Sequence, residues 1–245
     1  MKILIILIMT FSCFSAFENI PIDPEKIASG GLIFSNDDFR IEKISLSVLY
    51  PYEISEFIRT EIRSNFNIYD FNLLTEISHF GLEEYKETSL TFSLGSKLLS
   101  NFIVSPILEI HNLNIENSNE ILYSGGCRAI YNDDNFSLGV SLTKIFSSDS
   151  KKIAPVIFID TEMFLTDEIS ISSEIESDGE EDVIYKFGAE YKPFESIKFL
   201  VGINPELYSI NGGFSFKFSN LRFSYGVAYH NYLGLSHSSG IIYDL

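Results

Sequence analysis

The feature that most constrains this chain is an alternation of apolar and polar residues with a period of two, which begins near residue 41. In the stretch 207–218, for example, Tyr208, Ile210 and Phe214 alternate with serine, asparagine and glycine. Successive side chains of a β-strand point to opposite faces, so this pattern predicts strands with one apolar and one polar face. The same pattern recurs in the stretches 88–98, 135–146, 183–192 and 221–229.

The makeup of the two faces separates a membrane barrel from a soluble sandwich, which would show the same period. The apolar face is aromatic, drawing on 22 Phe and 13 Tyr, and its rings often stand at segment ends, as in the girdles of outer-membrane barrels. The opposite face consists of serine, glycine and charged residues, as expected inside a barrel. The sequence therefore predicts an all-β fold, a transmembrane antiparallel β-barrel over residues 41–245.

The connections between the segments alternate in length. Every second one is tight: 67–70, 99–100, 132–134, 165–168, 193–196 and 219–220. Several others are longer and more polar: 81–87, 112–119, 147–152 and 177–182. Short periplasmic turns and longer external loops are typical of bacterial outer-membrane barrels.

The segments add up to about 14 strands, and 12 stays open as an alternative. An even number places both ends of the barrel at one rim. The predicted strands are 41–50, 55–66, 71–80, 88–98, 102–111, 120–131, 135–146, 153–164, 169–176, 183–192, 197–203, 207–218, 221–229 and 233–245.

The first 40 residues do not follow the strand pattern. Residues 1–16 predict a secretory signal peptide, with one lysine, an apolar run too short to span a bilayer, and then small residues. Lipidation at Cys13 is the alternative to simple cleavage. Residues 17–40 are rich in turn-forming residues and are expected to form a lead segment, either a plug inside the barrel or a loose periplasmic stretch.

Charge and composition exclude several classes of function. The chain has 34 acidic against 17 basic residues, a net charge of -17, which disfavours nucleic-acid binding because phosphates would be repelled. None of the four histidines has metal-ligand spacing, and the acidic stretch 177–182 lacks the ligand order of a calcium loop. If Cys13 is removed with the signal peptide, Cys127 is the lone thiol and forms no internal disulfide. No cofactor is expected.

Ser105, Glu109 and His111 share one face of a predicted strand and come nearest to a hydrolase triad. Serine is so frequent here that coincidence explains this set, and we predict that the protein is not an enzyme. Ten charged residues of both signs are expected to face the lumen, where they either pair across strands or line a polar path or ligand pocket. They are Glu109, Arg128, Asp160, Glu162, Glu174, Lys186, Glu190, Lys198, Lys217 and Arg222.

Two parts of the chain carry a family resemblance. One lies within 50–87; the other includes the strand Gly188-Ala189-Glu190-Tyr191, the glycine-rich stretch 212–216, the stretch 223–229 and Leu233-Gly234-Leu235-Ser236-His237. In this order they resemble PorV-type and related FadL-like outer-membrane barrels, although Ser224 stands where that family usually has Asp. The resemblance implies about 14 strands and a role in passing hydrophobic molecules across the outer membrane or in secretion. It carries no ligand-contacting residue over to this chain.

The leading functional prediction is a passive outer-membrane channel or transporter for small or hydrophobic molecules. A structural or secretion-associated barrel without transport is the first alternative, and a membrane-embedded lipid-modifying enzyme is the second. The expected partners are outer-membrane lipid, the barrel assembly machinery and, for apolar cargo, a hydrophobic small molecule. The assembly machinery reads a terminal strand such as 239–245, where Ile241, Tyr243 and Leu245 share a face.

Overall fold

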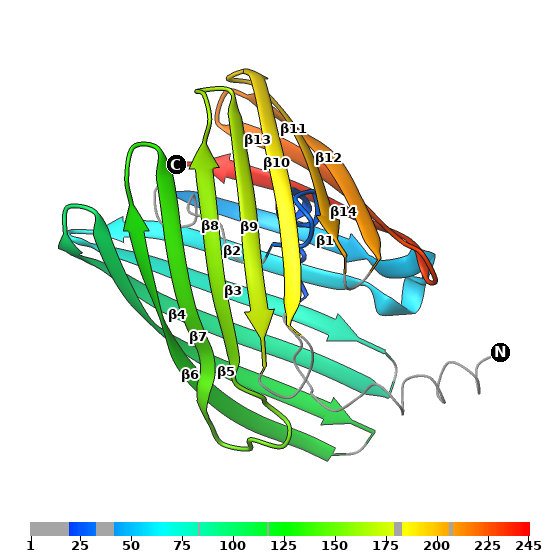
Figure 1. Cartoon of the computed structure of the whole chain (residues 1–245). Helices are drawn as coiled ribbons and strands as arrows, with labels where there is room; N and C mark the ends of the chain where they lie inside the picture. The colour runs from blue at the N-terminus through cyan, green and yellow to red at the C-terminus, as the bar shows by residue number, and fades with distance from the viewer. Residues whose placement is uncertain (1–19, 33–41, 83, 117, 179–182, 206–207) are drawn as a thin grey trace.

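The computed structural model describes residues 20–32, 42–82, 84–116, 118–178, 183–205 and 208–245. Within them, fourteen antiparallel strands form one closed barrel in which each strand pairs with its neighbours in sequence and β1 pairs with β14 (Figure 1). The prediction of a closed barrel of about 14 strands is confirmed. The strands are β1 Lys43–Tyr50, β2 Arg59–Ile68, β3 Phe71–Gly81, β4 Tyr85–Leu99, β5 Phe102–Ile115, β6 Ser118–Asn132, β7 Phe136–Ser147, β8 Val156–Phe164, β9 Ile169–Ser177, β10 Ile184–Phe194, β11 Ile197–Asn204, β12 Ser209–Phe218, β13 Leu221–His230 and β14 Gly234–Asp244.

The barrel closes where its first and last strands meet. Lys43 pairs with Asp244, and the backbone N–H of Leu245 donates to the carbonyl of Glu42 at 3.0 Å. Both ends of the barrel therefore lie at one rim, here called the short-turn rim, and the opposite one is the long-loop rim. Six connections of two to four residues lie on the short-turn rim, as predicted: 69–70, 100–101, 133–135, 165–168, 195–196 and 219–220.

Two of the predicted long loops are wrong. The expected loops 81–87 and 112–119 shrink to 82–84 and 116–117, because β4, β5 and β6 continue further than the apolar pattern does. Outward positions in these extensions are polar, as at Asn112 and Asn114, so the hydrophobic alternation fades there. The ladder continues all the same, since it needs only backbone N–H and C=O groups.

Two predicted strands begin three or more residues later than expected. The second begins at Arg59 and not at 55, because two 3-10 turns, η2 Pro51–Glu53 and η3 Ser55–Phe57, occupy the connection. The eighth begins at Val156 and not at 153, because the buried Ile153 packs against Leu113 and Leu122. The acidic loop predicted at 177–182 and the signal peptide lie mostly or wholly outside the described residues.

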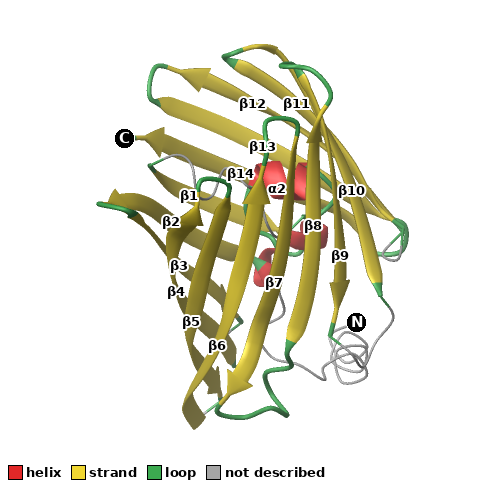
Figure 2. Ribbon diagram, turned by 60° about the vertical axis from the view of Figure 1, so that its left-hand side comes forward, coloured by secondary structure: helices red, strands yellow, loops and turns green. Residues whose placement is uncertain are grey.

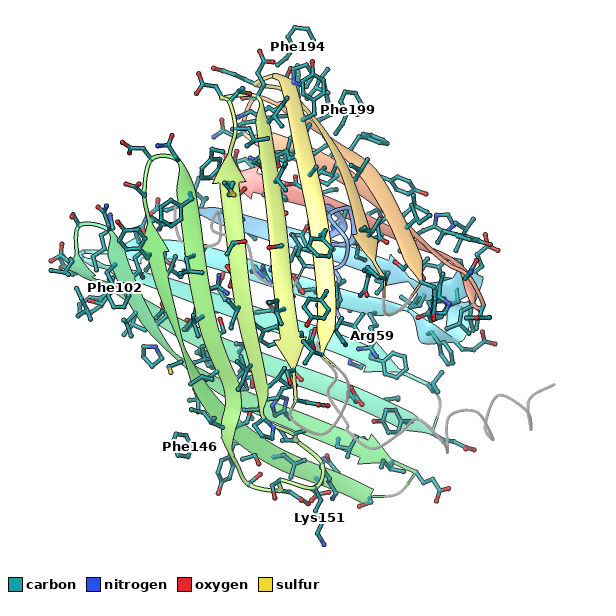
Figure 3. The ribbon with its side chains drawn as sticks, viewed as in Figure 1. Arg59, Phe102, Phe146, Lys151, Phe194 and Phe199 are labelled. Carbon is teal, nitrogen blue, oxygen red and sulfur yellow. The ribbon has the colours of Figure 1, made fainter. Side chains whose placement is uncertain are left out.

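The outer face of the barrel is apolar and exposed. Ile210 keeps 67% of its surface accessible and Val201 keeps 60%, whereas the inward residues between them are serine, asparagine and glycine. Aromatic side chains such as Phe194 and Phe102 stand near the short-turn rim, and Phe146 stands near the other rim (Figure 3). A soluble sandwich would bury such a face against a second sheet, whereas a closed barrel leaves it for lipid.

A charge on this face tests the lipid contact. We expect Val201→Arg, near the middle of β11, to lower the free energy of unfolding in lipid by about 2–4 kcal/mol, because arginine at the bilayer midplane is costly. Tyr232→Arg, at a rim position that is 78% exposed, is the matched control and should cost about 0–1 kcal/mol. Equal, small losses in both variants, measured by urea unfolding in liposomes, would contradict a lipid-facing surface.

Candidate functional site: a two-chambered lumen

An inner segment, residues 20–32, lies inside the barrel against the inner faces of β11–β14 (Figure 2). It contains the short helix α2 Pro24–Ala28, whose N-cap Asp23 accepts a hydrogen bond from the backbone N–H of Glu25 at 2.8 Å. Proline at the first helical position suits this start, because its missing N–H needs no partner there. No helix among the described residues has the length and hydropathy needed to cross a bilayer.

A row of inward-facing glycines leaves room for the inner segment to lie against the barrel wall. A Cβ at Gly202 would lie 2.1 Å from the backbone nitrogen of Gly30, and one at Gly226 would lie 2.3 Å from the carbonyl oxygen of Pro24. Such contacts are shorter than any real Cβ makes, so only glycine lets the two backbones approach this closely. We call the row the glycine seat; its members, one on each of β10–β14, are Gly188, Gly202, Gly213, Gly226 and Gly240.

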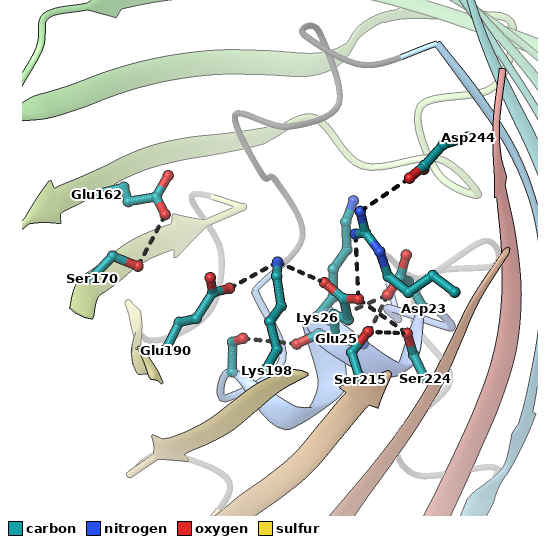
Figure 4. Close-up of polar contacts among 12 residues, drawn as sticks. Asp23, Glu25, Lys26, Glu162, Ser170, Glu190, Lys198, Ser215, Ser224 and Asp244 are labelled. Carbon is teal, nitrogen blue, oxygen red and sulfur yellow. Dashed lines mark hydrogen bonds and ion pairs between the residues drawn. The ribbon is translucent and has the colours of Figure 1, made fainter. Parts of the chain in front are cut away.

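Glu25 joins the inner segment to the wall by charge. Its carboxylate lies 3.2 Å from Lys198 Nζ and 3.7 Å from Arg222 Nη1, and it accepts a hydrogen bond from Ser224 Oγ at 3.0 Å (Figure 4). Burial acts to raise the pKa of Glu25, but the charges of Lys198 and Arg222 outweigh it and lower the pKa to about 2. Glu25 is therefore ionised at neutral pH, and its charge favours the seated segment.

Uncharged contacts hold the segment on both sides of Glu25. Asn211 Nδ2 donates to the carbonyl of Ile27 at 2.6 Å, and Ser238 Oγ donates to the carbonyl of Ile22 at 2.6 Å. Ile22 and Ile27 also pack with Leu49 in a buried apolar cluster. The segment is thus bound by backbone, charge and apolar contacts together.

The inner segment borders two cavities. The long-loop cavity, about 760 Å³ with its open mouth, is bordered by the ends of β2–β5 near the long-loop rim. The short-turn cavity, about 650 Å³, is bordered by β8–β11 toward the short-turn rim. Lys26 of α2 borders both cavities. Lys26 therefore stands where the two cavities approach each other.

The ten charged residues predicted to face the lumen do so, and many of them pair across strands. Arg128 Nη2 lies 2.9 Å from Asp160, Lys186 lies 2.9 Å from Glu174, and Lys198 lies 3.0 Å from Glu190. Near the short-turn rim Lys217 and Arg222 both approach Asp244, at 2.6 and 3.6 Å. Pairing of this kind allows charges to be kept inside the barrel.

The triad-like set Ser105, Glu109 and His111 is not assembled. Six strand positions separate Ser105 from His111, which is roughly 20 Å at the usual rise per residue, and Ser105 Oγ has no hydrogen-bond partner. His111 instead lies 2.9 Å from Ser89 Oγ and 3.0 Å from Ser124 Oγ, and Ser124 donates to Glu109 at 2.7 Å. All three residues lie on one face of β5, but only Glu109 and His111 are close, with 3.9 Å between Glu109 Oε2 and His111 Nε2.

Sequence reasoning missed Glu25, the glycine seat and the buried carboxylate Glu61. Glu25 lies in a segment without a strand pattern, so nothing marked it as a wall contact. A signal for the seat was present: its glycines recur every 11 to 14 residues, once in each strand from β10 to β14. In the described residues, no group of three or more His, Cys, Asp or Glu is placed to hold a metal ion.

No protein-family model matches this chain, and no curated protein matches its sequence. Solved structures do match. The CymD monoaromatic hydrocarbon channel has a TM-score of 0.63 at 11% identity, with 94% of this chain and 99% of CymD covered. The Pseudomonas putida toluene transporter TodX has a TM-score of 0.58 at 9% identity, with 93% and 96% covered. At these identities the likeness establishes the fold, which is that of outer-membrane β-barrel channels.

Proposed function

We propose that this protein is an outer-membrane barrel that passes small molecules passively, with residues 20–32 acting as its plug. The observation that carries the proposal is the lumen, where two polar cavities adjoin one inner segment seated on glycines. A lipid-facing outer surface and the predicted signal peptide support the location. The neighbours in fold are channels and transporters by name, which supports a role without catalysis.

The predicted cargo is small or hydrophobic molecules, and the lining of the cavities favours small polar solutes among them. Glutamates, lysines and serines border both cavities, and Arg59 and Arg63 border the long-loop cavity, whereas the names of CymD and TodX refer to hydrocarbons. The motif resemblance and the fold neighbours together support a place among FadL-like barrels. A PorV-type role in secretion stays the alternative.

Liposome swelling and planar-bilayer recording on the refolded full chain test this function. We expect KCl conductance and uptake of small polar solutes, both increased when the plug is displaced by substitution in the glycine seat. Heat-modifiable migration on a gel would show that each sample contains a folded barrel. A folded barrel that stays silent with the plug seated and with it displaced would leave the structural alternative.

A further inference from the structure

Lys26 lies inside the barrel between two facing parts of the wall. It borders both the long-loop cavity and the short-turn cavity. The residue is buried, and its charge acts electrostatically on Glu61 of β2 and on Asp160 of β8. These two strands are on nearly opposite sides of the ring of fourteen strands. The ammonium group of Lys26 is therefore an interior charge at the junction of the two cavities.

The two cavities have the same balance of charge when Lys26 is left out and histidine is counted as neutral. Four carboxylates and three other cations border the long-loop cavity. Four carboxylates also border the short-turn cavity, and in the ion pairs of the described residues Lys198, Arg128 and Arg222 face three of them. Each set thus holds four carboxylates against three cations, and Lys26 adds a fourth cation that both sets share.

The charge of Lys26 acts on an ion in either cavity without direct contact. The interaction of two charges falls off slowly with distance, and it is stronger beside low-dielectric walls than in bulk water. Fixed charges of one sign in a pore select ions of the other sign. The excess of carboxylates alone would attract cations into both cavities, and Lys26 opposes their transfer from one cavity to the other.

We propose that Lys26 is the specificity-determining residue of the barrel, which restrains the passage of small cations relative to neutral and anionic solutes. The inference rests on the proposed channel function and names the charge class of its solutes. The position of Lys26 depends on the seated inner segment, because its neighbour Glu25 pairs with Lys198 and Arg222 of the wall. Displacing the segment should therefore remove the influence of Lys26.

Planar-bilayer recording of the full-length protein in a gradient of dilute KCl tests this role, because dilute salt screens charge least. Lys26→Gln should raise the permeability ratio of potassium to chloride by roughly threefold or more, whereas Lys26→Arg should leave it unchanged. Lys151→Gln is the control with the same loss of charge. Lys151 is exposed in the connection between β7 and β8 and points away from the barrel (Figure 3), so its variant should keep the wild-type ratio.

The variant with Gly202→Ala and Gly226→Ala, which displaces the inner segment from the glycine seat, separates the position of Lys26 from net charge. In that background Lys26→Gln should leave the permeability ratio unchanged, because residue 26 no longer lies between the cavities. If Lys26→Gln alone does not fold, or opens as much as the double variant, Lys26→Met takes its place because it keeps the apolar stem. An equal shift in both backgrounds, or no shift in the seated barrel, overturns the proposal.

The same recordings keep this proposal distinct from the proposed function. A barrel that conducts with one permeability ratio in the wild type and in Lys26→Gln removes the role of Lys26 and leaves the channel. A folded barrel that is silent in every variant, including the double glycine variant, removes the channel and this role with it.

Discussion

Replacing Gly202 and Gly226 together by alanine is expected to open the lumen. The three atoms nearest to a new Cβ at Gly202 belong to Ser29 and Gly30, and those nearest to one at Gly226 all belong to Pro24. Because these are backbone or ring-bound atoms of the inner segment, no side-chain rotation relieves the clash. None of these nearest atoms belongs to the barrel wall, so the clash raises the free energy of the state in which the inner segment is seated.

The size of the effect follows from the cost of overpacking. Each added methyl group costs about 1–3 kcal/mol in a packed interior. Since about 1.4 kcal/mol changes a population tenfold, the unseated fraction should rise by at least about tenfold. Planar-bilayer recording should show this as a matching rise in the time spent conducting.

Gly212→Ala is the matched control for the glycine seat. Gly212 lies in β12 beside Gly213 of the glycine seat. A Cβ at Gly212 would meet only the carbonyl oxygen of Leu200 at 3.7 Å, which is an ordinary contact. Its conductance should equal that of the wild type. If the double variant migrates as a folded barrel and yet conducts no more than Gly212→Ala, the inner segment does not close the lumen.

The strand count could be read from the sequence because lipid favours apolar side chains at most outward positions. The period of two is plainest in β13, where the outward residues are Leu221, Phe223, Tyr225, Val227 and Tyr229. Where strands pass beyond the apolar band, as at Asn112 and Asn114 of β5, this requirement ends. The predicted boundaries failed at those positions.

Only some of the lumen-facing residues could be identified from the sequence. Charges such as Arg128 and Lys186 stood out because apolar neighbours marked the opposite face. Glu61 did not, because Thr60 and Ser64 are polar on the outward side of β2 and the two faces look alike in sequence. The partners of Glu25 lie 173 and 197 residues away in the chain, and only closure of the barrel brings Lys198 and Arg222 to it.

Acid should release the inner segment through Glu25. The pKa of Glu25 is lowered from 4.5 to about 2, so the seated state favours its charged form. That stabilisation is complete well above pH 4.5, decreases as the pH falls through this range, and is absent below about pH 2. A difference of this size corresponds to about 3 kcal/mol, and open time should therefore rise steeply between pH 5 and about 2.

The Glu25→Gln variant separates this effect from general acid titration of the lumen. Lys198 also faces Glu190, and Arg222 also faces Asp244, so those two carboxylates share the cationic partners of Glu25. The amide keeps the shape of Glu25 but loses its charge, so the variant should conduct more at pH 7 and change far less on acidification. Bilayer recordings at stepped pH measure both. If the variant opened with acid as steeply as the wild type, Glu190 or Asp244 would be the group that responds, and Glu25 would hold the segment by shape alone.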